Sequence, residues 1–120
     1  MSNSSAADLA RRSCTPCPSG TKPLSGSEVA PILVDLPGWK VEENRLLREY
    51  SFSSYLSGIG WVSVMAEIAD REDHHPDINI SWCRVRVSLW THTVNGLSMN
   101  DLILAAKLEE AWKKFQSKMV

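Results

Sequence analysis

The chain has 120 residues, of which 43% are hydrophobic and 22% charged, and its formal net charge is -1. This length suits a single domain with one two-layer core and leaves little room for a second domain. The near-neutral charge gives no electrostatic basis for binding nucleic acid or an anionic membrane surface, so we expect a small molecule or further copies of the chain as partners.

The start of the chain, MSNSSAADLARRS, lacks the apolar stretch of a secretory signal. No run in the sequence approaches the roughly 18 apolar residues that span a bilayer. We therefore expect no membrane span and a cytoplasmic location. The Ser, Ala and Arg content of the first residues, with Asp8 as the single acid, leaves a trimmed organelle transit segment as an alternative.

Residues 1–24 show no hydrophobic period and contain several Pro and Gly residues, which predicts a flexible N-terminal tail before one domain over residues 25–120. The three cysteines, an odd number, indicate no disulfide framework. Cys14 and Cys17 have the CxxC spacing of a metal or redox site, and a zinc site would need His74 and His75 as further ligands. The surrounding Ser, Pro and Gly favour two reduced thiols on a mobile tail.

The first predicted helix lies in SGSEVAPILVDL, where Ser25 and Glu28 have the spacing of a capping box. The next stretch, GWKVEENRLLREYSF, contains two short alternating apolar runs around the polar segment Glu42-Glu43-Asn44. Such runs around a polar segment are typical of a β-hairpin.

A second helix is predicted from Ser53 or Ser54 to about Glu72, because apolar residues recur there every three or four positions. Pro76 disfavours helical dihedrals at the preceding residue, so this helix must end at or just before the histidine pair. DINISW and RVRVSLWTH alternate with period two and predict two further strands. Ser98 then opens a last helix, with Asp101 placed to cap it.

The predicted order is therefore α-β-β-α-β-β-α. This order indicates an α+β fold with one four-stranded antiparallel sheet and three helices packed on one face. The other face of such a sheet is left to water or to a partner, and the strands carry Trp and aliphatic side chains. We therefore expect self-association.

All three histidines lie between positions 74 and 92. Histidine has an unperturbed pKa of about 6.5 and can exchange a proton near neutrality. If the two last strands form a hairpin, His74, His75 and His92 come to the same end of the sheet, where Asp70 and Asp73 can orient an imidazole. One pocket with three imidazoles would suit general acid–base catalysis.

A purely structural explanation stays open, because histidine at a helix C-terminus interacts favourably with the helix dipole and His92 would be an exposed strand end. No GxSxG motif, Gly-rich phosphate loop or P-loop lysine is present, so the sequence offers no basis for acyl transfer or nucleotide binding.

The histidines also stand in a longer pattern, which resembles the signature of the pterin-4a-carbinolamine dehydratases, small enzymes of tetrahydropterin recycling. That signature is a polar or acidic residue, then His-His-Pro, an aromatic residue, a histidine and an aspartate. The matching positions here are Asp70, His74-His75-Pro76, Trp82, His92 and Asp101. The similarity extends over about residues 24–116, including LPGWKV, and the CTPC leader and LWTH look most like bacterial, cyanobacterial and plant members.

The resemblance implies dehydration of 4a-hydroxytetrahydropterin to quinonoid dihydropterin in tetrahydrobiopterin recycling, with neither a metal nor an organic cofactor. It implies a pterin substrate and a homodimer or homotetramer. A non-catalytic relative that serves as a dimerisation or assembly cofactor for another protein is the alternative.

The resemblance also implies residue roles. His74 and His92 correspond to the acid–base pair, and His75 to a catalytic residue that mainly binds and orients the pterin. Further residues expected to bind the pterin are Asp73, Trp90, Thr91 and Thr93. Asp70 and Asp101 are expected to orient the histidines, and Asp101 to cap the last helix as well.

Overall fold

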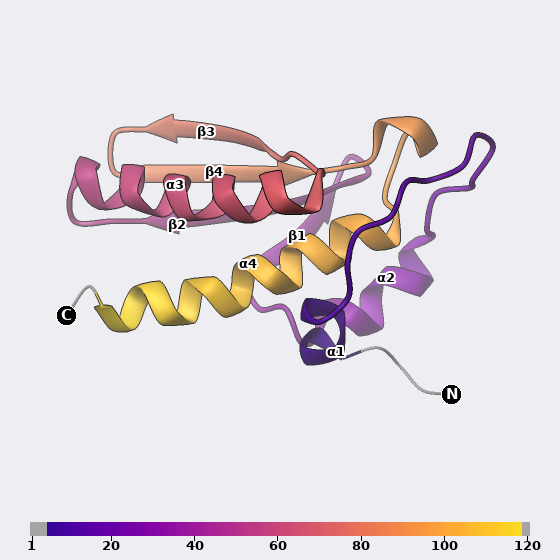
Figure 1. The fold of residues 1–120 in the computed structure, drawn as a ribbon, viewed down its shortest axis with the longest axis horizontal. Helices are drawn as coiled ribbons and strands as arrows, with labels where there is room; N and C mark the ends of the chain where they lie inside the picture. Colours follow the sequence, from indigo (N-terminus) through magenta and orange to yellow (C-terminus); the bar gives the residue numbers. More distant parts are fainter. Residues whose placement is uncertain (1–4, 119–120) are drawn as a thin grey trace.

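The computed structural model describes residues 5–118. Its elements in chain order are α1 (Ala6–Ala10), α2 (Gly26–Leu33), β1 (Trp39–Glu42), β2 (Arg45–Ser51), α3 (Tyr55–Glu72), β3 (Asp77–Ser81), β4 (Arg84–Leu89), the 3-10 turn η1 (His92–Val94) and α4 (Met99–Lys118) (Figure 1). The predicted order α-β-β-α-β-β-α is confirmed over α2 to α4, and α1 precedes it.

The four strands form one antiparallel sheet in the order β1-β2-β4-β3. Leu46 pairs with Leu89 and Tyr50 with Val85, and all four side chains are buried on the helix-covered face. The alternate positions Arg84, Arg86 and Ser88 of β4 are polar or charged and face outward, as the period-two pattern predicted, whereas the alternate positions of β2 include the apolar Leu47. One face of the sheet therefore belongs to the core and the other is open.

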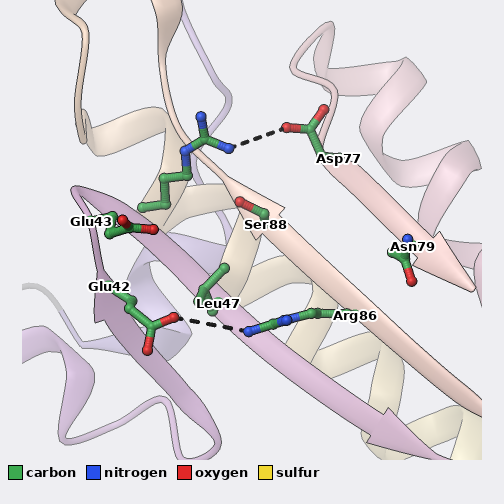
Figure 2. A pocket seen from close by; sticks show the side chains of 8 residues that line it. Glu42, Glu43, Leu47, Asp77, Asn79, Arg86 and Ser88 are labelled. Atoms are coloured by element: carbon green, nitrogen blue, oxygen red, sulfur yellow. Dashed lines mark ion pairs between the residues drawn. The ribbon is translucent and has the colours of Figure 1, made fainter.

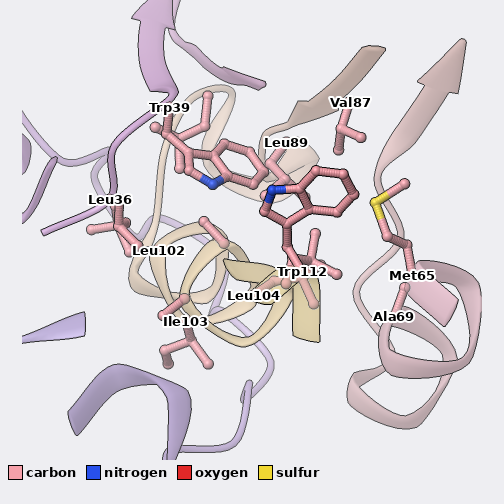
Figure 3. Close-up of a cluster of buried hydrophobic side chains, with 14 of the residues drawn as sticks. Leu36, Trp39, Met65, Ala69, Val87, Leu89, Leu102, Ile103, Leu104 and Trp112 are labelled. Atoms are coloured by element: carbon pink, nitrogen blue, oxygen red, sulfur yellow. The ribbon is translucent and has the colours of Figure 1, made fainter. Parts of the chain in front are cut away.

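The core lies between this sheet, α3 and α4 (Figure 3). Tyr50 from β2 contacts Trp61 from α3 and Trp112 from α4 edge-on, with ring centroids 5.3 and 4.7 Å apart. Trp61 and Met65 are fully buried. Edge-to-face packing of this kind adds to the stabilisation that burial alone gives. The aromatic residues thus fix α3 and α4 against the sheet and against each other.

A buried polar contact connects the start of the sheet to α4. Trp39 in β1 donates its indole N–H to Glu109 at 3.0 Å, and the Arg48 guanidinium lies 3.5 Å from the same carboxylate. A carboxylate in this environment needs such partners because an unpaired buried charge is costly. The sequence stretch LPGWKV therefore has a structural role, because its Trp39 connects β1 to α4.

Helix α1 is a difference from the sequence prediction, which placed a tail without regular structure over residues 1–24. Ser5 caps α1 by accepting the Asp8 N–H at 3.2 Å, and Leu9 is completely buried where α1 packs on α4. A helix of five residues with a single buried side chain has no hydrophobic period to detect. Residues 1–4 of the predicted tail lie outside the described residues, and the domain boundary at residue 25 stays a prediction.

Within residues 5–118, no helix has both the length and the apolar character that crossing a membrane requires.

Candidate functional site

The turn after α3 sets the direction of the histidine pair. Helix α3 ends at Glu72, as predicted, and Asp73 follows with a left-handed φ of 51°, a conformation that Asp tolerates better than most residues. The backbone N–H groups of Asp73 and His74 both bond to the carbonyl of Ala69. Pro76 cannot continue the helix. The two imidazoles therefore leave the chain at a fixed junction between α3 and β3.

The side chain of His74 is bound to a buried carboxylate. Its Nε2 lies 2.6 Å from Oδ1 of Asp101, which is fully buried in the first turn of α4, while 14% of the His74 side chain is exposed. Because an ionised carboxylate only accepts hydrogen bonds, the Nε2 atom carries the hydrogen. This bond fixes both the tautomer and the orientation of the His74 ring.

The second oxygen of Asp101 holds the surrounding backbone. Oδ2 accepts the Ser98 N–H at 2.9 Å and the Thr91 hydroxyl at 2.8 Å. The Thr91 hydroxyl in turn lies 2.7 Å from that of Ser98, which must donate because the Thr91 hydrogen is already used. Asp101 therefore caps α4, as predicted, and the same carboxylate holds His74.

The polar groups of Thr91 are bonded within the protein. Its hydroxyl bonds to Asp101, its N–H donates to the Gly96 carbonyl at 2.8 Å, and its carbonyl accepts the Gly96 N–H at 3.3 Å. Gly96 itself packs so closely on Pro23 that an added Cβ would lie 2.9 Å from the proline Cβ. These contacts make a tight loop, in which Thr91 holds Asp101, the partner of His74.

His92 is presented by this loop beside Trp90. The two rings have centroids 3.9 Å apart, and the Arg45 guanidinium carbon lies 4.5 Å from the centre of the Trp90 ring. His92 is exposed, whereas Trp90 is half-buried. A cation over an indole is attracted to the π-system. Arg45, Trp90 and His92 thus form a stack next to Thr91, and through Thr91 they are connected to Asp101 and His74.

His75 points to a different environment from His74. Its Nε2 lies 3.2 Å from Oδ1 of Asp70, and the two side chains are 58% and 85% exposed. A shallow cavity of about 390 Å³ adjoins this pair, lined by Ala66, Glu67, Ala69, Asp70, His75, Pro76 and Ile78. Asp70, which was expected to orient an imidazole, contacts His75, whereas a single pocket for all three imidazoles stays a prediction.

The remaining predicted residues, Asp73 and Thr93, are exposed near the two histidine segments. The alternative zinc set does not assemble. Over residues 5–118 no three His, Cys, Asp or Glu side chains are placed to hold a metal ion, and all three cysteines are free thiols. Cys14 instead contacts α4 through Asn100.

A larger hollow lies on the open face of the sheet, near the starts of β2 and β3 and the end of β4. It has a volume of about 460 Å³ and is lined by Glu42, Glu43, Arg45, Leu47, Asp77, Asn79, Arg86 and Ser88. Figure 2 shows that its charged groups face one another, with ion pairs between Arg45 and Asp77 and between Arg86 and Glu42, each 3.9 Å long. None of its lining residues is a histidine, and Arg45 connects it to Trp90, whose ring its guanidinium covers.

Comparison with known proteins identifies the family. Residues 22–111 match the family described as pterin 4 alpha carbinolamine dehydratase. The chain belongs to the pterin-4a-carbinolamine dehydratase family.

Relatives named pterin-4-alpha-carbinolamine dehydratase include one from Dechloromonas aromatica, 44% identical over 86% of this chain and 92% of the relative. Another is from Rickettsia canadensis, 41% identical over 84% and 94%. A crystal structure described as a transcriptional coactivator/pterin dehydratase from Brucella melitensis has a TM-score of 0.70 and 30% identity, covering 74% of this chain and 97% of that one.

A further solved structure, described as a pterin dehydratase-like protein and RuBisCO assembly factor of the alpha-carboxysome, has a TM-score of 0.50 and 19% identity, with coverage of 60% and 83%. At this identity it shows the shared fold alone. The family is that of a hydro-lyase, and its reaction is the dehydration of a pterin carbinolamine.

Several residues that shape the site in this dehydratase fold were not predicted from the sequence. Arg45 is the first residue of β2 and Trp90 follows the end of β4, so their contact depends on the pairing of β2 with β4, which the sequence did not specify. Glu72 and Asn100 are polar residues next to the signature, but they bond to the N-terminal segment, where nothing was expected. Ser98 was expected as a helix cap, and its hydroxyl also supports Thr91.

Proposed function

We propose that the chain dehydrates 4a-hydroxytetrahydropterin to quinonoid dihydropterin by proton transfer from and to histidine side chains, in the recycling of tetrahydrobiopterin. In the substrate, the leaving hydroxyl and a ring nitrogen share one carbon. An acid protonates the hydroxyl, the C–O bond breaks as water departs, and the nitrogen lone pair forms the C=N bond. A base takes the proton that the nitrogen loses, so the net change is the loss of one water molecule.

The bond between His74 and Asp101 is the observation that carries this proposal. Because Asp101 holds the Nε2 hydrogen, Nδ1 is the atom of His74 that is left to exchange a proton with the substrate. A buried carboxylate behind a partly exposed imidazole is an arrangement that orients a general acid or base. A histidine that served only as a helix cap would not need a fully buried partner.

His92 is the second proton-transfer group in the proposal. It follows Thr91 directly, and Thr91 shares Asp101 with His74, so one hydrogen-bond network supports both histidines. Its exposed ring rests on Trp90, which limits its rotation. Trp90 then acts as a wall beside the pterin, with its own ring held by Arg45.

His75, Asp73 and Thr93 are proposed to bind the pterin. All three are exposed and lie in the two segments that carry the catalytic histidines. Asp70 orients His75 by the 3.2 Å contact between them. Thr91 is proposed to take part through its support of Asp101, since its own polar groups are all bonded within the protein.

The test is dehydration of freshly generated 4a-hydroxytetrahydropterin, followed by absorbance. The parent protein should accelerate the reaction above the uncatalysed rate. His74→Ala and His92→Ala should each lower kcat by about a hundredfold or more, because a lost general acid or base has about that effect. His75→Ala should act more on KM. Asn79→Ala, an exposed change on the open sheet face, is the control.

Retention of the fold in each variant is checked by circular dichroism. Parent-like kcat in both His74→Ala and His92→Ala would refute the assigned histidine roles. A parent protein without activity, together with a protein partner recovered at fixed stoichiometry, would support the assembly-cofactor alternative instead. We also propose a homodimer or homotetramer as the working form.

A further inference from the structure

The described part of the N-terminal segment packs on α4, which carries Asp101, and is bonded to the end of α3, just before His74. We call residues 6–17 the strap. It begins with α1, whose Leu9 is buried against the core beside α4, and continues through Cys14, Thr15 and Cys17. In Figure 1 this indigo segment runs from the side of α4 toward the loops at the end of the sheet where β4 ends. Neither the signature residues nor the family reaction assigns it a task.

Asn100 fastens the strap to the first turn of α4. Its Oδ1 accepts the Thr15 N–H at 3.0 Å and its Nδ2 donates to the Thr15 carbonyl at 2.6 Å. Nδ2 also lies 3.6 Å from Cys17 Sγ, and Cys14 Sγ donates to the Asn100 carbonyl at 3.5 Å. The Asn100 side chain is buried, and the next residue is Asp101. One side chain therefore holds both backbone groups of Thr15.

The strap also binds the end of α3. Glu72, the last residue of α3, accepts the Cys14 N–H at 2.8 Å and lies 3.6 Å from Lys107 of α4. Lys107 donates to the Ala10 carbonyl, at the end of α1, at 2.7 Å. Because the side chains of Glu72 and Lys107 are 15% and 19% exposed, water competes weakly for these contacts. Glu72 precedes His74 by a single intervening residue.

These contacts give the strap a hold on both partners of the His74–Asp101 bond. The two residues come from different elements, 27 positions apart, so a 2.6 Å bond requires the end of α3 and the start of α4 to keep a fixed relation. The strap is bonded to Glu72 on one side and to Asn100 and Lys107 on the other. A displacement of about 1 Å at a reacting group can cost on the order of a hundredfold in rate.

We propose that the strap positions the His74–Asp101 pair for dehydration, with Asn100 as the positioning residue that fastens it. The proposal rests on the proposed function, because its kinetic effect is measured on that reaction. The strap does not touch the substrate. It acts through Glu72 and Asn100, and its contribution is to keep Nε2 of His74 within bonding distance of Asp101.

The test compares Asn100→Ala with Thr15→Pro in the full chain. Asn100→Ala removes both side-chain hydrogen bonds to Thr15. Thr15→Pro removes the backbone N–H that donates to Asn100, so it weakens the same contact from the strap. Each should lower kcat by about tenfold to a hundredfold with little change in KM, as loss of a supporting partner does. In the double variant the second change should cost little, because both remove the same connection.

A second readout follows the His74–Asp101 bond without any substrate. In the parent protein, proton NMR should show a hydrogen-bonded imidazole N–H signal that disappears in His74→Ala. The signal should broaden or shift in Asn100→Ala and in Thr15→Pro. Asn79→Ala, on the open sheet face, and Arg11→Ala, an exposed strap residue paired with Asp8, are the controls and should leave both kcat and the signal unchanged.

Parent-like kcat and an unchanged imidazole signal in both strap variants would overturn the proposal while leaving the dehydratase function standing. Strictly additive losses in the double variant would also overturn it, because they would mean two separate effects. An inactive parent would instead refute the proposed function, and the NMR signal would still decide whether the strap holds the pair. If Asn100→Ala does not fold, Thr15→Pro, in a loop, decides the outcome.

Discussion

Nε2 of His74 lies 2.6 Å from Oδ1 of Asp101, and the other oxygen of the same carboxylate binds the backbone at the start of α4. One buried group therefore joins the end of α3 to the first turn of α4. The capping bond stabilises the helix, and the helix in turn holds the carboxylate still. This coupling makes the orientation of His74 part of the fold, because the ring is held by a helix and not by a flexible loop.

Asp101→Asn should separate the two tasks of this carboxylate. The amide oxygen can still accept the Ser98 N–H, but the amide NH2 then faces His74 and cannot accept its Nε2 hydrogen. We expect kcat to fall by about tenfold to a hundredfold. The free energy of unfolding should fall by about 1 kcal/mol or less, since much of the cap survives. Steady-state kinetics and urea unfolding measure the two effects.

Glu110→Gln is the control for this change, because Glu110 is an exposed carboxylate on the same helix. It should change neither kcat nor stability beyond experimental error. If Asp101→Asn retained parent-like kcat, the orienting role of Asp101 would be wrong and the carboxylate would be a helix cap alone.

The dual role of Asp101 was predictable because both of its causes are local or recurrent. The capping spacing from Ser98 is visible in the sequence, and His74, His92 and Asp101 stand in one signature. The strand alternation likewise gave the sheet and its buried face, because period two decides which side chains point inward.

The contacts around the signature were not predictable, because their causes are neither local in the sequence nor part of a recurrent motif. The Cys14 N–H reaches Glu72 across 58 positions of sequence, and the bond is made by a backbone group that any residue carries. Leu9 is the one buried side chain of helix α1. Such contacts depend on the tertiary arrangement of α3 and α4 and leave no periodic pattern in the chain.

Gly96→Ala should disturb the loop that presents His92. A Cβ at this position would lie 2.9 Å from the Pro23 Cβ, a distance that forces one of the two segments to move. Overpacking of this kind costs about 1–3 kcal/mol, and here it also displaces Thr91, which pairs with Gly96. We expect a lower melting temperature and a lower kcat, measured by calorimetry and by the dehydration assay.

Removal of the opposing atom supplies the internal check for this prediction. Pro23→Gly deletes the Cβ that the new methyl group meets, so the double variant should recover activity relative to Gly96→Ala. Gly26→Ala is the matched control, because nothing lies within 4 Å of its added Cβ and it sits in helix α2. That change should be neutral or stabilising by up to about 1 kcal/mol. A Gly96→Ala protein as stable as Gly26→Ala would contradict the packing argument.

Cys14 should be an unreactive thiol with a measurable effect on alkaline stability. Burial, with the Glu72 carboxylate as the next cause, raises the pKa of Cys14 from 9.0 to about 12. Between these values the unfolded chain loses the proton while the folded chain keeps it, so the free energy of unfolding falls as pH rises through this window. Below about pH 9 the thiol has no such effect.

Urea unfolding at about pH 8 and about pH 10.5 tests this prediction. The parent should lose more stability between the two pH values than Cys14→Ser, which has no thiol to titrate. Alkylation at about pH 8, followed by mass spectrometry, should label Cys14 much more slowly in the folded than in the unfolded chain, because the thiolate is the reactive form. Equal labelling rates, or equal pH slopes for the two proteins, would show that Cys14 is not shielded as described.

Leu56→Glu should weaken self-association. Leu56 and Tyr55, in the first turn of α3, are 77% and 50% exposed, and Trp82 at the β3–β4 turn is 76% exposed. The Phe52 N–H donates to the Cys83 carbonyl at 2.8 Å, so these apolar residues lie at the same end of the molecule (Figure 1). A group of large exposed apolar side chains marks a surface that contacts another protein. A glutamate in a first helical turn interacts favourably with the helix dipole, so α3 itself should remain folded.

Light scattering of the purified parent should give the mass of a dimer or tetramer, and Leu56→Glu should shift it toward the monomer. Val34→Glu is the matched control, because Val34 is 80% exposed but follows α2, which lies toward the opposite end of the molecule (Figure 1). It should leave the mass unchanged, since a charge there meets only water. A monomeric parent, or a Leu56→Glu protein with the parent mass, would show that this end of α3 is not an interface between copies of the chain. Its exposed apolar side chains would then be a surface for another partner.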